Sequence, residues 1–97
     1  MQHRLSKQAT DDLLRIADYY LEYSLRTSES VRDDIDAVFK LLEQYPKSGT
    51  LMQDGTRKNV SGKYRYVVSS VIEGDDVVIL AVYRYQDRTP MPGRSRT

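Results

Sequence analysis

Apolar residues in the first half of the chain recur every three or four positions in two segments, one after Ser6 and one after a polar break at residues 26–28. This spacing predicts two amphipathic helices, because it gathers the apolar side chains on one helix face. Ser6 and Ser28 are expected to be the N-caps. Pro46 should end the second helix, since proline disfavours helical geometry in the residue before it. The short link predicts an antiparallel helix hairpin. The two apolar stripes are Ala9, Leu13, Ile16, Ala17, Tyr20 and Leu21, and then Val31, Ile35, Val38, Phe39 and Leu42.

The second half of the chain has the pattern of β-strands. Residues 63–85 contain two β-branched and aromatic runs around a Glu-Gly-Asp-Asp cluster at positions 73–76, which predicts a β-hairpin. The second run, residues 77–83, is apolar at nearly every position, so we expect this strand to be covered on both faces. Two helices can cover only one face of so small a sheet, and something else is expected to cover the other. Short strands are also expected at residues 2–5 and 57–60.

Together these elements predict an α+β domain in the order β-α-α-β-β-β. A short N-terminal strand would precede an antiparallel helix hairpin, which would pack on one face of a small, mainly antiparallel sheet. Residues 1–86 would form this single domain. Residues 87–97 are rich in proline and arginine, have Met91 as their only apolar residue, and are expected to be a disordered basic tail.

The composition excludes several classes of chemistry. The 97 residues include no cysteine, which excludes disulfides and thiolate metal sites. The sequence has no Gly-rich phosphate loop, no Ser/His/Asp set and no cluster of metal ligands, so no metal or other cofactor is expected. The single histidine, His3, is expected to be structural. The N-terminus lacks the apolar core of a signal peptide and no apolar run could span a membrane, which predicts a cytoplasmic protein without a membrane partner.

Charge is distributed unevenly along the chain. Residues 1–55 carry 7 Lys+Arg and 10 Asp+Glu, a net of −3, whereas residues 56–97 carry 8 and 4, a net of +4. The half that forms the sheet is therefore the half that would meet an anionic surface or an acidic partner. The alternative is that acids simply cover the helices while the tail collects arginines.

These features resemble the ParE/RelE superfamily of bacterial toxin–antitoxin systems, and the resemblance covers nearly the whole chain. Each shared residue is a weak signal alone, but their order and spacing together are specific. They are Leu5-Ser6, Ala9, Asp12-Leu13 and Ile16 at the first helix, Leu42, Pro46 and Gly49 after the second, Arg57, Gly62 and Tyr64-Arg65 before the hairpin, and the apolar run 78–82.

The two branches of this superfamily imply different functions. A ParE-like protein would be the toxin of a type II toxin–antitoxin (plasmid stabilisation) system. It would inhibit DNA gyrase without being an enzyme, and a cognate antitoxin encoded by the neighbouring gene would neutralise it by direct binding. A RelE-like protein would be a ribosome-dependent, metal-independent endoribonuclease that cleaves messenger RNA. A third, weaker alternative is a non-toxic binding or regulatory module on the same fold.

The overall charge favours the ParE-like branch. The chain has a net charge of only +1, whereas a protein that engages many phosphates usually has a pronounced basic excess. The expected length of the helix hairpin also resembles ParE more than RelE. Arg84 stands where ParE-like members often have histidine and RelE-like members lysine or arginine, so this position leaves the branch open.

The candidate site residues differ between the branches. Cleavage through the 2′-hydroxyl of RNA needs a base, cations at the phosphate and an acid. In the RelE-like alternative these roles would fall to Lys58, Arg65, Arg84 and Tyr85, with Lys63 as another candidate for the base. In the ParE-like branch no catalytic residue is expected, and the target-facing residues would be Arg57, Arg65, Tyr83, Arg84, Tyr85 and Arg88, although these arginines would equally suit an acidic antitoxin tail. The antitoxin would occupy the second sheet face and the groove of the helix hairpin, with Val77, Ile79, Ala81, Tyr64 and Tyr66 as its contacts.

Overall fold

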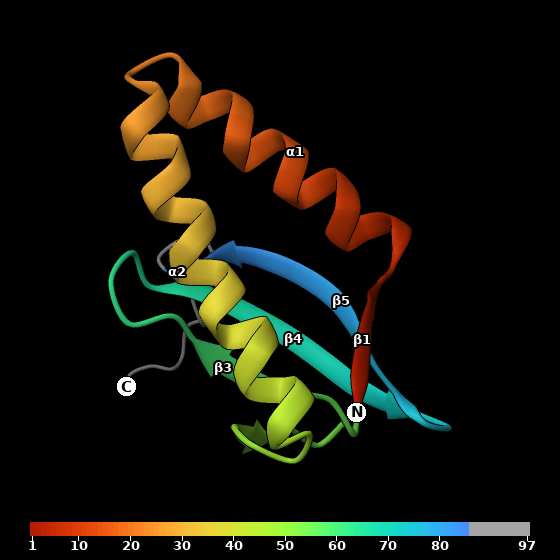
Figure 1. The fold of residues 1–97 in the computed structure, drawn as a ribbon. Coiled ribbons are helices and arrows are strands. Elements are labelled where there is room, and N and C mark those ends of the chain that lie inside the picture. Colours follow the sequence, from red (N-terminus) through yellow and green to blue (C-terminus); the bar gives the residue numbers. More distant parts are fainter. Residues whose placement is uncertain (86–97) are drawn as a thin grey trace, which may run out of the picture.

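The chain, in a computed structural model that describes residues 1–85, forms one five-stranded sheet with two helices packed on it (Figure 1). The strand order is β1-β5-β4-β3-β2, with β1 parallel to β5 and all other neighbours antiparallel. The predicted α+β class and element order are confirmed, with one further two-residue strand between α2 and β3. The elements are β1 (Gln2–Leu5), α1 (Lys7–Leu21), α2 (Leu25–Gln44), β2 (Thr50–Leu51), β3 (Arg57–Val60), β4 (Tyr66–Glu73) and β5 (Asp76–Arg84).

Both helices begin at serine N-caps. Ser6 Oγ accepts a hydrogen bond of 3.0 Å from Ala9 N, as predicted for α1. The prediction of Ser28 as the second cap is wrong, because the cap is Ser24, whose Oγ accepts a hydrogen bond of 3.0 Å from Thr27 N. Ser28 lies in the first turn of α2, where its hydroxyl donates to Ala17 O of α1 at 3.5 Å. Both serines have a side chain suited to capping, so local sequence did not distinguish them.

The hydrophobic core lies between the two helices and one face of the sheet. Tyr66 and Val68 of β4 and Val77, Ile79 and Val82 of β5 point into it and are almost fully buried. The interval along β5 changes from two residues to three because the pairing of β4 with β5 shifts between Ser69 and Ser70, which leaves Leu80 without a partner position. Such a β-bulge changes which residues face the core. The helices contribute Ala9, Val31, Ile35, Val38, Phe39 and Leu42.

The outer face is the face of the sheet remote from the helices. It carries Val67 and Val71 of β4, paired with Tyr83 and Val78 of β5, so β5 is apolar on both sides as the sequence predicted. No helix or strand within residues 1–85 forms a second layer over this face. No helix of the described part of the chain is long and apolar enough to cross a membrane.

His3 of β1 has the structural role expected of it. Its ring packs against Phe39 of α2, with centroids 5.0 Å apart. Its Nδ1 lies 2.7 Å from Oε2 of Glu43, and this hydrogen bond lowers the pKa of the Glu43 carboxyl. His3 therefore fastens the first strand to the end of α2.

Candidate functional site

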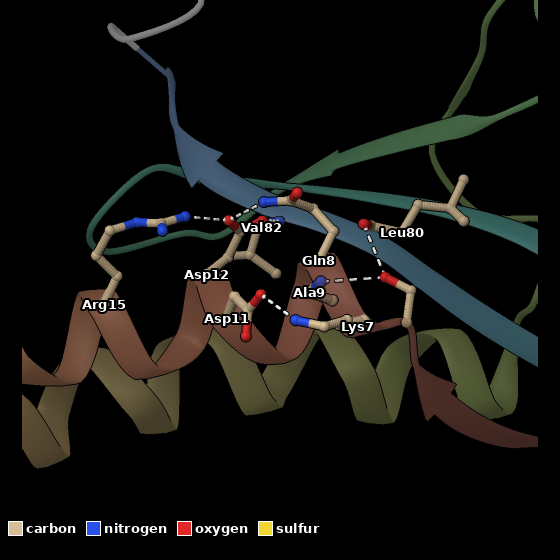
Figure 2. A network of polar contacts seen from close by, with 9 residues as sticks. Lys7, Gln8, Ala9, Asp11, Asp12, Arg15, Leu80 and Val82 are labelled. Atoms are coloured by element: carbon tan, nitrogen blue, oxygen red, sulfur yellow. Dashed lines mark hydrogen bonds and ion pairs between the residues drawn. The ribbon is translucent and has the colours of Figure 1, made fainter.

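The start of α1 completes the hydrogen bonding of β5. Strand β1 ends at Leu5, opposite Ile79, while β5 continues to Arg84. Ser6 continues the pairing where β1 ends, since its backbone N–H donates to Ile79 O at 2.9 Å. Its hydroxyl donates to Leu80 O at 3.0 Å (Figure 2). The first turns of α1 thus hold the second half of β5 in place.

Asp12 continues this contact one turn further along α1. Its carboxylate is 7% exposed and accepts a hydrogen bond of 2.9 Å from the backbone N–H of Val82. It also accepts from Gln8 Nε2 at 2.7 Å and from Arg15 Nη2 at 2.6 Å (Figure 2). These three donors satisfy a buried carboxylate that would otherwise be costly. The sequence marked Asp12 only as one of the residues shared with the toxin superfamily, whereas the structure shows that its carboxylate holds the backbone of β5.

A cleft of about 310 Å³ lies between α1 and the end of β5. Arg84 reaches this cleft because it pairs with the core residue Tyr66, and alternation places it on the side of the sheet opposite to Tyr83. The cleft therefore combines two arginines with tyrosine rings. Its lining residues are Asp12, Arg15, Ile16, Tyr19, Tyr66, Val82, Tyr83 and Arg84.

A tight turn before β4 presents Arg65. The hairpin was predicted to begin at residue 63, but β4 begins at Tyr66, and the Ser61 side chain accepts a hydrogen bond from Tyr66 N at 2.9 Å. Arg65 has a φ of +62° and is the only residue other than glycine with positive φ in the described part of the chain. A bulky residue in this conformation is strained, and such strain is often found at functional sites.

Helix α2 holds this turn through Asp34. The carboxylate accepts hydrogen bonds from the backbone N–H of Lys63 at 3.0 Å and of Tyr64 at 2.7 Å. Ser30, one helical turn away, lies 3.0 Å from Lys63 Nζ and 3.1 Å from the Tyr64 hydroxyl. Burial acts to raise the pKa of the Asp34 carboxyl, but the backbone hydrogen bonds favour its ionised form more strongly and hold the pKa below its usual value.

Four residues at one end of the sheet form what we call the sheet-end patch: Lys58, Arg65, Tyr83 and Tyr85. The Arg65 guanidinium carbon lies 5.4 Å from the centroid of the Tyr85 ring, and Tyr85 N donates to Arg65 O at 3.1 Å. Lys58 Nζ lies 5.9 Å from the centroid of the Tyr83 ring and donates to Ser69 Oγ at 3.0 Å. Both distances are within the range of cation–π interactions.

The structure brings together only part of the predicted target-facing set. Arg65, Tyr83 and Tyr85 belong to the sheet-end patch, while Arg84 lies on the opposite side of the strand. Arg57 is elsewhere, opposite Ser70, and its Nη1 donates to Lys47 O at 2.8 Å. Arg88, and with it the predicted tail at residues 87–97, lies outside the described residues.

Three of the five residues predicted to contact an antitoxin lie in the core. Val77 and Ile79 are 0% exposed and Tyr66 is 2% exposed, so a partner would reach them only by opening the packing of helices on sheet. A strand that is apolar on both sides does not reveal from sequence which residues the helices will cover. Ala81 is half-buried on the outer face, and Tyr64 is half-buried against Tyr20, with ring centroids 6.2 Å apart.

A groove of about 350 Å³ lies between α1 and α2, near the closed end of the V that the two helices form (Figure 1). Leu21 and Leu25 line it and are 50% and 63% exposed. Leu14 of α1 adds a third leucine to the helix surface and is 62% exposed. The remaining lining residues are Leu13, Ile16, Ala17, Ser28, Glu29, Val31, Arg32, Ile35 and Asp36. We call this site the inter-helix groove.

Neither site has the ligands of a metal centre. Within residues 1–85, no group of three or more histidine, cysteine, aspartate or glutamate side chains could hold a metal ion. The sheet-end patch instead combines tyrosine rings with cations, and the inter-helix groove is lined largely by apolar side chains; both kinds of surface suit the binding of a macromolecule.

Similarity to known proteins agrees with this architecture. The family described as "ParE toxin of type II toxin-antitoxin system, parDE" matches residues 4–88. No curated protein matches the chain significantly. The fold is similar to a solved structure described as "Chromosomal ParDE TA system from P. aeruginosa", with a TM-score of 0.76 and 22% sequence identity over 87% of this chain and 95% of that chain. This identity is low enough that the structural likeness shows the fold alone, but the family match spans most of the sequence. The chain belongs to the ParE toxin family of type II toxin–antitoxin systems.

Proposed function

We propose that this toxin inhibits DNA gyrase and is neutralised by a cognate antitoxin, encoded by the neighbouring gene, that seats an apolar segment in the inter-helix groove. The observation that carries the antitoxin site is the exposure of Leu21 and Leu25, which line that groove. Contiguous exposed apolar surface of this kind marks sites of protein association. Since gyrase acts on chromosomal DNA, the toxin would act in the cytoplasm.

Covering the inter-helix groove would contribute part of the free energy of binding. Fully burying a leucine side chain contributes about 1.5–3 kcal/mol. Leu21 and Leu25 are at least half exposed, so covering their free surface would contribute on the order of 2 kcal/mol before the entropy of association is subtracted. A helix or an extended segment with apolar side chains would supply the matching surface.

The sheet-end patch and the neighbouring cleft are the best candidates for contact with gyrase. Tyrosine and arginine are enriched at the energetic centres of protein interfaces. Arg65 is held in a strained conformation by contacts from α2, and its ring partner Tyr85 is 54% exposed. Arg84 would contribute from the cleft on the other side of β5.

The test is plasmid supercoiling by gyrase with the purified full chain, alone and with the product of the neighbouring gene. Inhibition that the neighbour relieves is the expected result. Arg65→Ala should weaken inhibition about tenfold and leave antitoxin binding intact, whereas Arg26→Ala, an exposed arginine on α2, should change neither.

The antitoxin side has its own matched pair of variants. Leu21→Lys should inhibit gyrase normally but escape neutralisation, because a charge would enter the apolar groove. Leu41→Lys, 40% exposed and outside the groove, should remain neutralised. Folded protein that does not inhibit gyrase at any excess would overturn the gyrase proposal, and messenger RNA cleavage on ribosomes would then be the activity to assay.

A further inference from the structure

The cleft between α1 and the end of β5 combines an apolar interior with two arginines on different walls. We propose that it binds a small monocarboxylic acid with an aromatic body, whose carboxylate meets the guanidinium groups of Arg15 and Arg84 and whose ring packs against Tyr19. The cleft volume of about 310 Å³ is at the lower end of the range for ligand pockets, about 300–1,000 Å³. The inference goes beyond the proposed function, since this ligand is neither gyrase nor an antitoxin.

The interior of the cleft suits the aromatic body of such a ligand. Ile16 of α1 and Val82 of β5 line it, and Tyr19, which is 46% exposed, adds an aromatic ring. This ring is held in place, because it makes edge contacts with the rings of Tyr20 and Tyr23, whose centroids are 5.0 Å and 5.4 Å away. A side chain that is already fixed loses little entropy when a ligand ring packs against it.

Two arginines reach the cleft from different elements, Arg15 from α1 and Arg84 from β5. The Arg15 side chain is 69% exposed, and its Nη2 donates to Asp12 Oδ1 at 2.6 Å (Figure 2). A guanidinium group has five N–H donors, so this bond orients the group and leaves further donors for a ligand. Arginine is also the cation whose paired donors match the two oxygens of a carboxylate.

The charges that line the cleft favour a monoanion. Arg15 and Arg84 contribute two positive charges and Asp12 one negative charge, a net of +1, which a single carboxylate would balance. A nucleic-acid strand carries a charge at every nucleotide and would bring several negative charges to this one net positive charge. Asp12 keeps its own three donors, among them Val82 N, and the ligand would take the remaining donors of Arg15.

NMR titration of the isotope-labelled full chain with phenylacetate tests the inference directly. Three related compounds separate the features of the ligand: phenylacetamide lacks the charge, acetate lacks the ring, and benzylamine carries the opposite charge. We expect phenylacetate to bind with a dissociation constant below about 1 mM, and at least about tenfold more tightly than each of the three. The amide resonances that shift should belong to residues that line the cleft, on α1 and at the end of β5.

Variants separate the charge of the site from its ring. Arg15→Gln should weaken the binding of phenylacetate about tenfold, and Arg15→Lys, which keeps the charge but not the paired donors, should have an intermediate affinity. Tyr19→Ala should weaken binding about fivefold, whereas Tyr19→Phe, which keeps the ring, should bind like the unmodified chain. Arg26→Gln and Tyr45→Ala replace exposed residues outside the cleft and are the matched controls.

Several results would overturn the carboxylate site. These are absence of binding by the folded chain, equal affinity for phenylacetate and phenylacetamide, or a folded Arg15→Gln or Tyr19→Ala variant with unchanged affinity. Shifts concentrated at Leu21 and Leu25 would place the acid in the inter-helix groove instead, and tighter binding of phenyl phosphate would refute the preference for a single charge. Binding is measured without gyrase or antitoxin, so binding without gyrase inhibition refutes only the gyrase proposal, and inhibition without binding refutes only this site.

Discussion

Replacing Asp12 tests how strongly α1 holds the second half of β5. Asp12→Ala removes the acceptor of the buried Val82 N–H, and an unsatisfied buried donor costs about 1–3 kcal/mol. The bonds from Gln8 and Arg15 are lost as well, but the Arg15 side chain is 69% exposed, so its ion pair adds no more than about 1 kcal/mol. We expect Asp12→Ala to lower the free energy of unfolding by about 3 kcal/mol.

Asp12→Asn separates the acceptor from the charge. The asparagine carbonyl can still accept the hydrogen bond from Val82, and its amide group can donate to the carbonyl of Gln8 once that side-chain amide is rotated. Only the interaction with Arg15 is lost, so the cost should be about 0.5–1 kcal/mol. Asp11, a neighbouring acid paired with the 90% exposed Lys7, provides the control Asp11→Ala, for which we expect less than about 0.5 kcal/mol.

Thermal and urea unfolding followed by circular dichroism measure these differences. In a domain of this size 1 kcal/mol corresponds to about 4–8 °C in Tm, so Asp12→Ala should melt about 12–24 °C lower and Asp12→Asn about 2–8 °C lower. The exchange rate of the Val82 amide should rise in Asp12→Ala and not in Asp12→Asn. Equal destabilisation by both variants would show that the charge of Asp12, and not its hydrogen bond with Val82 N, is responsible for the effect. A loss of less than about 1 kcal/mol in Asp12→Ala would refute the inference that Asp12 holds the second half of β5.

The remaining predictions concern the turns that shape the sheet-end patch. The pKa of Asp34 is lowered in the folded protein, so the ionised carboxylate stabilises the fold. The unmodified chain should therefore be more stable than Asp34→Asn in urea unfolding near neutral pH, and this difference should decline as the pH falls below about 4. A difference that grows with acidification would contradict this prediction. Arg65→Gly should be about 0.5–1 kcal/mol more stable than Arg65→Ala, because glycine adopts a positive φ without the steric strain of a Cβ. Equal stabilities of the two variants would refute the inference that the backbone at residue 65 is strained. Gly49→Ala should lower the free energy of unfolding by more than about 2 kcal/mol, because a Cβ there would lie 2.6 Å from Lys58 O. Gly55 also has a positive φ but has open space around it, so Gly55→Ala should cost about 1 kcal/mol. Similar Tm values for the two variants would contradict the close contact at Gly49.

Sequence alone determined the main elements of this fold and their order, except for the two-residue strand β2. Helical and strand periodicities are local properties of the chain, so both helices, the hairpin of β4 and β5 and the α+β class followed from the spacing of apolar residues. The same local features carried the resemblance to the toxin superfamily. Local reasoning failed at boundaries, where Ser24 and Ser28 are equally suited to capping and where the turn at residues 63–65 has the composition of a strand.

Only the tertiary structure decided which side chains share a surface. β5 is apolar on both faces, and the bulge at Leu80 shifts its alternation, so burial of Val77 and Ile79 under the helices depended on packing that the pattern does not encode. The separation of Arg84 from Arg65 depended on strand pairing. The role of Asp12 depended on β1 ending before β5 does, which leaves a backbone N–H that a residue 70 positions away satisfies. Such contacts arise between segments distant in sequence, and for that reason they had no local signal.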